Sequence, residues 1–429
     1  MGRVQKLPYG KRFIELDLNK LGSVQLVEPN PVLNERDEEV IVREALEHPM
    51  GSISLKELTK GVKKILIITN DNTRPMPSKI TIPAIIRSFY WDERYYDITI
   101  LIANGLHREM REEEMREQFG EEICSKYRIV NHNASDRTQL VDFGRLSSGN
   151  VLWLNKLLVE HDLIISEGFI EPHFFAGYSG GRKSILPGVA GEETILHNHR
   201  PENIASPYAT GANLDGNPIH KECQEAAKMG KLAFILNVAL DRSKKIVGAF
   251  AGDPVKAHTC GCEYVKRMMS VAAKRTDIVI TTNNGYPLDR NLYQVVKGID
   301  TASKIVKEGG VIIVAAECME KVGHKNFEDL ILSCRSVEEL HCKMSSPPST
   351  ADKWQVQILA RALKKYKIIL VSDGIDQALS EKLFLIHAVS VEEAVKKAFL
   401  IKGTGASVTV MPEGPVTIPV VNDEIRCLG

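Results

Sequence analysis

The sequence predicts an α/β protein built from two α/β domains, each with a mostly parallel sheet, and a functional site in the cleft between them. Short runs of apolar, β-branched residues alternate with helical patterns, which is typical of parallel strands connected by helices. The length of 429 residues exceeds one ordinary hydrophobic core and favours two. Polar clusters directly follow several predicted strands, where open α/β sheets bind their ligands.

The first domain is expected to span residues 1–270. Its predicted buried strands lie at residues 63–71, 96–105, 161–170 and 231–240. Its predicted helices lie at residues 77–91 and 111–123, and the second opens with acidic side chains, which the helix dipole favours at an N-terminus. A further helical pattern at residues 264–275 marks the end of this domain.

The second domain is expected to be smaller and to span residues 271–429. Its predicted strands lie at residues 276–285, 309–318 and 364–374, with a helix near residues 289–307. The tail at residues 407–421 has the pattern of strand and loop, and it can cross back to the first domain.

The composition is that of an ordinary globular protein, with 43% hydrophobic and 26% charged residues. The 55 basic and 55 acidic residues cancel, so we expect neither nucleic acid nor a membrane as a partner. No apolar run has the length of a membrane span or the pattern of a signal peptide. Eight cysteines are too few for a disulfide framework, and we expect a cytoplasmic protein. Cys260 and Cys262, with His258 nearby, can hold a soft metal, but buried thiols are the favoured interpretation.

Four predicted strands end in a polar cluster: NDNTRP, NGLHRE, EGFIEPHFF and NNGYPLDRN. The candidate residues in or just after these clusters are Asp71, Arg74, His107, His173, Tyr293, Gln294 and Lys297. Because ligands bind outside the carboxyl ends of the strands in open α/β sheets, the coincidence of four clusters points to a binding cleft.

Asp71 and Arg74 lie three residues apart around a turn. They can form a local ion pair that caps the turn, or Asp71 can orient Arg74 toward a carboxylate or phosphate of a ligand. His107 and His173 follow two different strands. Imidazole titrates near neutrality, so two such groups can serve as acid and base on opposite faces of one substrate carbon.

The glycine-rich stretch EPHFFAGYSGGRKSILPGVAG covers residues 171–191. It can form an anion nest, but it lacks the spacing of a Walker A loop, and no persuasive Rossmann fingerprint follows the first strand. Lys183 can form a covalent link to a cofactor, or Arg182 and Lys183 can merely solvate a loop. Of His197 and His199, one rather than both is expected to bind a metal, since residues two apart do not share a helix face.

The motifs ANGLHRE, EPHFFAGYSGGRKSILPGVAG followed by HNH, and GYPLDRNLYQVVKG together resemble the nickel-dependent lactate racemase family over nearly the whole chain. The resemblance implies an active site in the cleft between the two α/β domains. It also implies a nickel-pincer nucleotide, of the nickel-pyridinium-3,5-bisthiocarboxylic acid mononucleotide type, carried by the first domain and attached covalently at Lys183.

The same resemblance implies roles for individual residues. His107 and His173 would be the acid/base residues, and His199 would be the metal ligand. The residues that would contact the cofactor are Asp71, Asn72, Thr73, Arg74, Lys183, Pro187 and His199. The residues that would bind substrate are Arg74, Tyr293, Gln294, Lys297 and Trp354.

The implied activity is that of an isomerase, a 2-hydroxy acid racemase with lactate as the default substrate, working by reversible hydride transfer to the cofactor. The implied partners are the small 2-hydroxy acid and the proteins that synthesise and load the cofactor. Asn104 departs from the family, which often has threonine there, and can alter the pocket.

Two alternatives compete with this interpretation. A nicotinamide-dependent 2-hydroxy acid dehydrogenase requires a glycine fingerprint and a ribose-binding acid, for which the sequence offers no convincing pair. A non-catalytic protein that binds a nucleotide or a small acid has no need for two acid/base groups.

Overall fold

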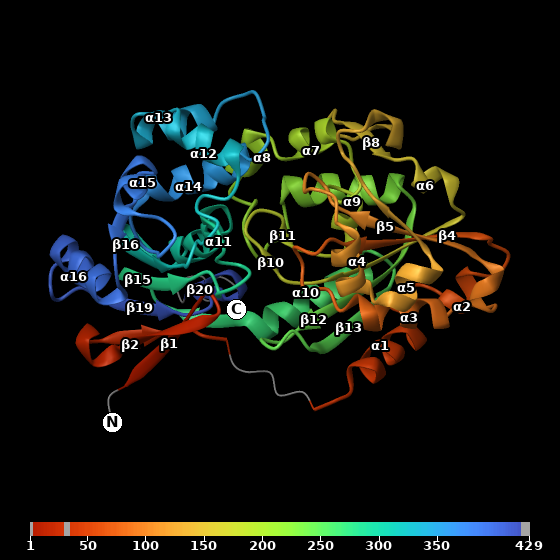
Figure 1. Cartoon of the computed structure of the whole chain (residues 1–429), viewed down its shortest axis with the longest axis horizontal. Coiled ribbons are helices and arrows are strands. Elements are labelled where there is room, and N and C mark those ends of the chain that lie inside the picture. Colours follow the sequence, from red (N-terminus) through yellow and green to blue (C-terminus); the bar gives the residue numbers. More distant parts are fainter. Residues whose placement is uncertain (1–2, 30–34, 422–429) are drawn as a thin grey trace. The chain divides into compact units, whose positions relative to one another are not determined.

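A computed structural model describes residues 3–29 and 35–421 of the chain, which form two compact units (Figure 1). Unit 1 contains residues 3–29, Arg200–Gly211 and 269–421, and unit 2 contains residues 35–199 and 212–268. Each unit has its own six-stranded sheet, and the predicted α/β class with mostly parallel strands is confirmed. No helix within the described residues is long and apolar enough to cross a membrane.

The sheet of unit 2 has the strand order β13-β12-β9-β4-β5-β6. All neighbouring strands are parallel except β12 and β13. The strands are β4 (Lys64–Asn70), β5 (Asp97–Ala103), β6 (Arg128–Asn131), β9 (Leu163–Phe169), β12 (Leu232–Leu240) and β13 (Ile246–Gly252). Two short antiparallel pairs accompany them, β7 (Leu140–Arg145) with β8 (Val151–Asn155) and β10 (Pro172–His173) with β11 (Gly177–Tyr178).

The helices of unit 2 are α1 (Glu38–Glu47), α2 (Leu55–Leu58), α3 (Ser78–Arg87), α4 (Glu112–Phe119), α5 (Glu121–Lys126), α6 (Leu157–Glu160), α7 (Glu192–Asn198), α9 (Pro218–Met229) and α10 (Lys256–Met269). Single 3-10 turns lie at Glu93–Tyr95, Arg137–Gln139 and Gly181–Ser184. All seven residues of β9 are buried, as expected for a strand that is covered on both faces. Ile65 and Ile67 of β4 and Ile165 of β9 are fully buried in the core.

The direction in which the strands are added reverses between β4 and β9 in unit 2. From β4 the chain adds β5 and β6 on one side, and it adds β9 and β12 on the other. Glu167 of β9, which is buried, accepts hydrogen bonds from Thr69 Oγ1 of β4 at 2.5 Å and from Ser78 Oγ of α3 at 2.6 Å. Thr81 Oγ1 donates a third. Burial raises the pKa of Glu167, and these bonds fix α3 to the two central strands.

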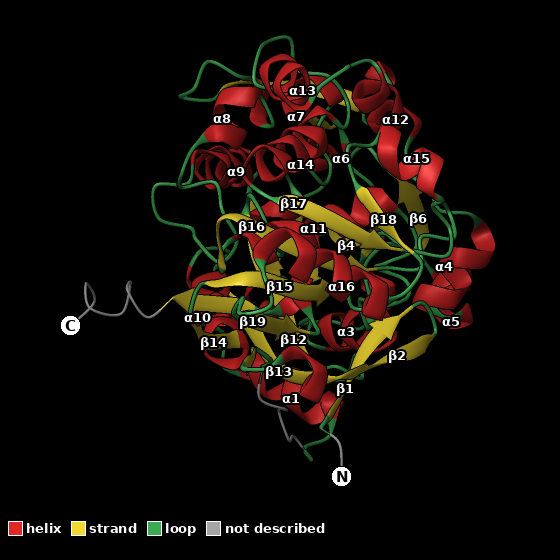
Figure 2. Ribbon diagram, turned by 90° about the vertical axis from the view of Figure 1, so that its left-hand side faces the viewer, coloured by secondary structure: helices red, strands yellow, loops and turns green. Residues whose placement is uncertain are grey.

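The sheet of unit 1 is parallel throughout, in the order β18-β17-β16-β15-β19-β3. Figure 2 labels its strands β15 to β19. Its strands are β3 (Val24–Leu26), β15 (Thr276–Thr282), β16 (Val306–Ala315), β17 (Lys367–Val371), β18 (Ile386–Ala388) and β19 (Val408–Met411). Its helices are α8 (Pro201–Ala205), α11 (Leu292–Ser303), α12 (Lys325–Leu332), α13 (Val337–Met344), α14 (Lys353–Lys365), α15 (Gln377–Lys382) and α16 (Val391–Lys402).

Further short elements of unit 1 are the hairpin of β1 (Val4–Tyr9) and β2 (Arg12–Asp17), the 3-10 turns Leu18–Leu21 and Gly414–Val416, and the pair of β14 (Ser270–Ala273) and β20 (Ile418–Val421). Segment 3–29 lies in this unit because β3 pairs with β19. The segment Arg200–Gly211 is tied to the same unit by Gln357 Nε2, which donates to the carbonyl of Pro201 at 2.9 Å.

Two predicted helices differ from the structure. The helix predicted at residues 111–123 is divided into α4 and α5 at Gly120, whose φ of 87° lies outside the helical range. The helix predicted at residues 264–275 ends at Met269, and Ser270–Ala273 form β14 instead. The reason is a distant partner, because β20 supplies the backbone groups with which β14 pairs. The predicted tail is strand and loop, as β19 and β20 show.

His132 of unit 2 is fully buried, and its ring is held neutral. Nε2 donates to the carbonyl of Ala190 at 2.9 Å, and Nδ1 accepts from Asn155 Nδ2 at 3.0 Å. Burial lowers the pKa of His132 from 6.5 to about 4. As the pH falls, the imidazole of His132 is therefore protonated in the unfolded chain before it is protonated in the folded chain. The contribution of the neutral ring to the free energy of unfolding is complete above pH 6.5 and is lost as the pH falls through about 4.

We predict that His132→Gln flattens the dependence of the unfolding free energy on pH between 6.5 and 4. The difference between the two pKa values corresponds to about 3 kcal/mol that the variant no longer loses on acidification. The measurement is urea unfolding at a series of pH values, with the exposed His48 changed to Gln as the control. An unchanged slope in His132→Gln would contradict the assignment.

Candidate active site

The predicted polar residues of unit 2 lie where the central strands of its sheet end. Asp71 follows β4, His107 follows β5, and His173 lies in β10 just after β9. Because β9, β4 and β5 are neighbours in the sheet, these three positions share one edge, next to the reversal of strand order. That edge is where α/β sheets bind ligands.

Asp71 and His107 form a pair across this edge. His107 Nδ1 lies 2.7 Å from Asp71 Oδ2, while Asp71 Oδ1 accepts from the backbone N–H of Thr73 at 3.2 Å and from its Oγ1 at 2.5 Å. Burial works to raise the pKa of Asp71, but the hydrogen bond and charge of His107, together with Thr73 and Arg74, hold it below its usual value. An ionised carboxylate only accepts, so His107 carries its proton on Nδ1 and its lone pair on Nε2.

Arg74 is paired with a residue that the sequence did not single out. Its Nη1 donates to Glu171 Oε1 at 2.9 Å, and both side chains are largely buried. Of the two alternatives for Arg74, the local ion pair with Asp71 is not formed, because the Asp71 carboxylate contacts His107 and Thr73. The turn between them is closed instead by the backbone N–H of Arg74, which donates to the carbonyl of Asp71 at 3.2 Å. Asn72 is exposed in this turn.

His173 is 7% exposed and lies against two aromatic rings. The ring of Phe174 is stacked on it at 5.1 Å, and the ring of Phe175 meets it edge-on at 4.6 Å. The backbone N–H of Ala176 donates to His173 Nδ1 at 3.3 Å, so the neutral ring carries its proton on Nε2. The two histidines are thus held with opposite arrangements of their ring protons.

Lys183 and His199 lie beside the same aromatic ring. Lys183 Nζ is 5.9 Å from the centre of the Phe175 ring, and the His199 ring meets Phe175 edge-on at 5.1 Å. His199 Nδ1 donates to the carbonyl of Ile195 at 2.9 Å, which leaves the lone pair of the neutral ring on Nε2. Burial, together with the charge of Lys183, lowers the pKa of His199 to about 4.

The glycine-rich loop packs against its own unit. A Cβ on Gly180 would come within 2.7 Å of Asn237 Oδ1, and one on Gly181 within 2.7 Å of His258 Cδ2. These glycines, both with positive φ, therefore let the loop approach β12 and α10. Asn237 Oδ1 also accepts from the N–H of Gly181 at 2.8 Å.

Arg182 is buried, so the interpretation that it solvates a loop is wrong. Its Nη2 donates to the carbonyl of Ala176 at 2.7 Å, and its Nη1 lies 2.9 Å from His258 Nε2. Burial lowers the pKa of Arg182. Cys262 is buried beside His258 with Sγ 3.5 Å from Nε2, as expected for a buried thiol, and Cys260 is half-buried. Across the described residues no group of three or more potential ligands could hold a metal ion.

Pro187 and Asn104 belong to loops that meet. The N–H of Gly105 donates to the carbonyl of Gly188 at 2.9 Å, which joins the loop after β5 to the loop that carries Pro187. The N–H of Gly188 donates to the carbonyl of Lys183 at 3.0 Å. Asn104 is buried, and its Nδ2 donates to the carbonyl of Arg108 at 3.1 Å while its Oδ1 accepts from the N–H of His132 at 3.1 Å.

Apart from Arg74, the predicted substrate residues lie on two adjacent helices of unit 1. Tyr293 and Gln294 begin α11, where Gln294 Oε1 accepts from Lys297 Nζ at 2.7 Å. Trp354, which is 9% exposed, begins α14. The ring of Tyr293 stacks on that of His324 at 3.9 Å. No motif in the sequence marks His324, whose Nδ1 lies 3.2 Å from Oδ2 of Asp352, 28 positions away.

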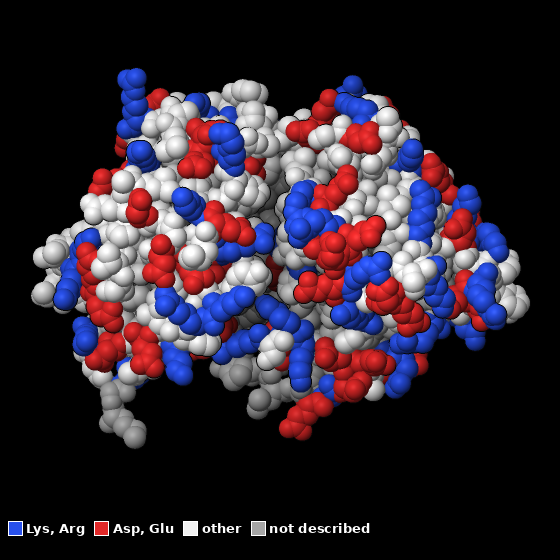
Figure 3. Space-filling view, viewed as in Figure 1, with Lys and Arg blue, Asp and Glu red and all other residues white. Residues whose placement is uncertain are grey.

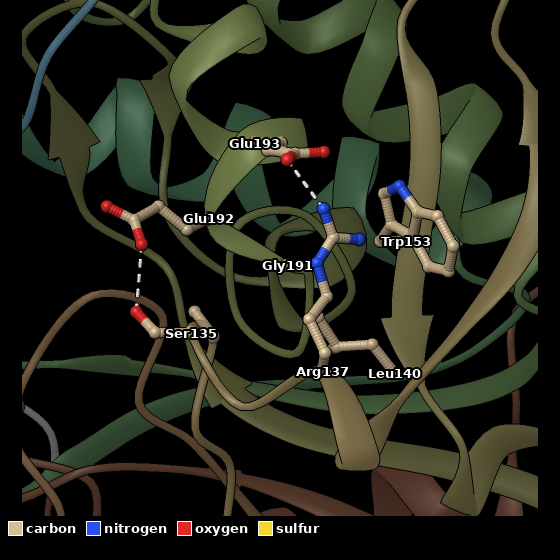
Figure 4. Close-up of a pocket in the computed structure, with 8 residues that line it drawn as sticks. Ser135, Arg137, Leu140, Trp153, Gly191, Glu192 and Glu193 are labelled. Atoms are coloured by element: carbon tan, nitrogen blue, oxygen red, sulfur yellow. Dashed lines mark hydrogen bonds and ion pairs between the residues drawn. The ribbon is translucent and has the colours of Figure 1, made fainter.

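A small pocket of about 80 Å³ lies beside the start of α7 (Figure 4). Arg137 is paired with Glu193 at 2.5 Å and lies 4.5 Å from the centre of the Trp153 ring. Ser135 Oγ donates to Glu192 at 2.8 Å. These charged groups bind one another, and they anchor the start of the helix whose last turn leads to His199.

Comparison with known proteins covers both units. Residues 9–211 match the lactate racemase N-terminal domain, and residues 271–420 match the lactate racemase C-terminal domain. The lactate racemase of Thermoanaerobacterium thermosaccharolyticum is 42% identical over 414 residues, which covers 95% of this chain and 97% of that protein. The lactate racemase of Lactiplantibacillus plantarum is 42% identical over 413 residues, with the same coverage.

Two solved structures resemble this chain in fold. The lactate racemase apoprotein of Thermoanaerobacterium thermosaccharolyticum superposes with a TM-score of 0.93 at 42% identity, covering 97% of this chain and all of that one. A protein from Thermotoga maritima, at a TM-score of 0.66 and 20% identity, shares the fold. The fold and these matches define an isomerase of the racemase class, built from two α/β units. The chain belongs to the lactate racemase family.

We predict that Asp71→Asn changes the tautomer of His107 without unfolding the chain. The carboxylate requires a donor at Nδ1, whereas an amide can itself donate to Nδ1 and so permit the proton to move to Nε2. The measurement is ¹⁵N NMR of histidine-labelled protein, which distinguishes the two nitrogens. The control is Asp142→Asn, at an exposed position. A His107 tautomer identical in the parent and in Asp71→Asn would contradict the assignment.

Proposed function

We propose that the chain interconverts the two enantiomers of a 2-hydroxy acid, with lactate as the default substrate, and that it does so with a nickel-pincer nucleotide held by unit 2. The observation that carries this proposal is the pair of histidines at the strand ends on either side of β4, held with opposite ring-proton arrangements. Membership of the lactate racemase family supports the choice of reaction.

Racemisation requires that the bond between hydrogen and Cα is broken on one face and remade on the other. The nickel-pincer nucleotide, when bound, supplies the acceptor for the hydride. His107 Nε2, which holds the lone pair, takes the hydroxyl proton of one enantiomer. The buried Asp71 carboxylate balances the charge that the ring then acquires.

His173 is the second acid/base residue in this proposal. To return a proton from Nε2, its ring must first take up a second proton on Nδ1, and the long 3.3 Å bond from Ala176 to Nδ1 is weak enough to be displaced there. The rings of Phe174 and Phe175 limit water around it. With one residue on each side of β4, each enantiomer meets a base, and the opposite residue returns the proton.

The residues of unit 2 fit the proposed cofactor. Lys183 and the neutral His199 lie beside one ring, so a group that is attached to the lysine can place its nickel within reach of the imidazole. At the end of β4, Asn70 Oδ1 is buried and has no hydrogen-bond partner, so it can accept from a nucleotide hydroxyl. The turn at the same strand end and the loop of Pro187 complete the proposed contacts, which are Asp71, Asn72, Thr73, Arg74, Lys183, Pro187 and His199.

Substrate carboxylate and hydroxyl would be bound by Arg74, Tyr293, Gln294, Lys297 and Trp354. Arg74 donates to Glu171 through Nη1 only, and a guanidinium has five N–H donors, so it can bind a second carboxylate as well. The proposed partners are the substrate and the proteins that load the cofactor, with no nucleic acid or membrane. The mixed acidic and basic side chains on the face shown in Figure 3 support that exclusion, and the proposed compartment is the cytoplasm.

We predict that His107→Ala and His173→Ala each abolish net racemisation. A complete turnover uses both residues, and one acid/base group typically contributes about 10²–10⁴-fold to the rate. The measurement is conversion of each pure enantiomer, followed by chiral chromatography on protein with matched nickel content. His341→Ala on α13 is the control and retains the parent rate.

Each histidine variant is also expected to retain slow partial reaction from one enantiomer only, because the remaining base serves one face. A variant that racemises both enantiomers near the parent rate would show that its histidine is structural.

We predict that Lys183→Ala purifies without nickel and without activity but remains folded. The side chain is half-buried and lies on a 3-10 turn, so its loss costs little core packing. The measurements are intact mass and nickel content of protein from a host that makes the cofactor, with the exposed Lys221→Ala as the control. A normal nickel content in Lys183→Ala would overturn the attachment, and bound nicotinamide dinucleotide in the parent would favour a dehydrogenase.

A further inference from the structure

Unit 1 contains a second pocket, of about 270 Å³, at the carboxyl ends of α11 and α14. Its third wall is the segment Ser206–Thr210, just after α8, and Figure 1 shows α8 and α14 side by side. The ionisable side chains that line it are Arg275, Asp300, Lys304, Arg361, Lys365 and Tyr366. None of the residues predicted for substrate or cofactor lines this pocket.

The pocket is strongly positive. Its lining has four cationic side chains and one carboxylate, which leaves an excess of three positive charges. The carboxyl end of each of the two helices carries roughly half a negative charge and offsets about one of the three. About two positive charges therefore remain, enough to attract a doubly charged anion.

One oxygen of the single carboxylate in the pocket, that of Asp300, already accepts a hydrogen bond. Asp300 is 4% exposed, and its Oδ1 accepts from Arg361 Nη2 at 2.9 Å. Its Oδ2 is buried and has no hydrogen-bond partner. A buried acceptor that remains unsatisfied costs about 1–3 kcal/mol, so Oδ2 favours a ligand that brings a hydroxyl or amino donor.

The remaining cations are placed to hold an anion. Arg275 Nη1 donates to the carbonyl of Lys304 at 2.6 Å, which positions the guanidinium at the end of α11. Lys304 Nζ lies 3.4 Å from the carbonyl of Gly211, and Lys365 is exposed on the rim. A guanidinium and two ammonium groups around one opening match the three oxygens of a phosphate group.

We propose that this pocket binds a small phosphate ester that also carries a hydroxyl group, of the sugar phosphate class. The phosphate lies among Arg275, Lys304 and Lys365, and a ligand hydroxyl donates to Asp300 Oδ2. The volume of about 270 Å³ lies just below the range of about 300–1,000 Å³ for drug-sized ligand pockets, which suits a small molecule of this class.

The pocket is connected to the proposed substrate residues by two helices. α11 carries Tyr293, Gln294 and Lys297 toward its start and Asp300 and Ser303 toward its end. α14 likewise begins with Lys353 and Trp354 and ends with Lys365. An ester that draws the two helix ends together therefore changes the affinity for the 2-hydroxy acid. This coupling rests on the proposed function, whereas binding of the ester does not.

The test of binding is isothermal titration of the full-length chain, purified without cofactor, at low ionic strength. The probes are ribose 5-phosphate, inorganic phosphate and ribose. Ribose 5-phosphate is expected to bind more tightly than phosphate, ribose not to bind, and added salt to weaken binding. Absence of ribose 5-phosphate binding, or binding no tighter than that of phosphate, overturns the proposal.

Variants locate the site. Lys304→Ala with Lys365→Ala is expected to weaken ribose 5-phosphate at least tenfold, and the exposed Lys382→Ala on α15 to leave it unchanged. Asp300→Asn is expected to abolish the preference for ribose 5-phosphate over phosphate. Should the double variant fail to fold by circular dichroism, Lys365→Glu alone, at an exposed position, serves the same purpose. Unchanged affinity in folded variants places the ligand elsewhere and overturns the site.

The test of coupling uses the nickel-loaded protein. Ribose 5-phosphate is expected to change KM for the 2-hydroxy acid in the parent and in Lys382→Ala, but not in the double variant. Binding without any change in KM overturns the coupling and leaves the site in place. A loaded protein without racemase activity refutes the proposed function, while the titration still decides the binding site.

Discussion

The buried carboxylate of Glu167 is the contact on which the arrangement of unit 2 depends. It joins Thr69 of β4 and the first turn of α3 to β9, at the point where the direction of strand addition reverses. The chain leaves the sheet on either side of this contact, toward Asp71 in one strand and toward Glu171 and His173 in the other. Three hydroxyl donors offset the cost of burying one acid, and the two loops therefore start from fixed positions.

Two pairs of side chains connect the loops that follow the central strands. The Asp71–His107 pair and the Arg74–Glu171 pair each join loops that follow different strands. Both are partly shielded from water, so they are stronger than surface pairs of the same kind. The two pairs accordingly fix the loops that carry His107 and His173, whose rings have opposite arrangements of their protons.

Much of this arrangement could be predicted from local patterns. The strands before Asp71, His107 and His173 each contain a short run of apolar residues, and each prediction of a strand there is confirmed. That Lys183 and His199 serve one site was implied only by the motif resemblance, since sixteen positions separate them, and their common contact with the Phe175 ring was not predicted.

What could not be predicted depends on distant partners. Glu171 was missed because its role is defined by Arg74, nearly a hundred positions away. The glycine-rich stretch suggested an anion nest, whereas the structure shows that Gly180 and Gly181 allow close packing against Asn237 and His258. The end of α10 was misplaced because β20, the partner of β14, is the last strand of the described chain.

The pairing of β3 with β19 has a consequence for synthesis on the ribosome. Residues 24–26 of β3 emerge long before the strand beside which they lie, which is completed only at residue 411. Every strand of unit 2 emerges between β3 and β19. The sheet of unit 2 can therefore form before β3 pairs with β19. The early strand is short, and its three residues are only half-buried even when paired, which keeps an unpaired edge small during that interval.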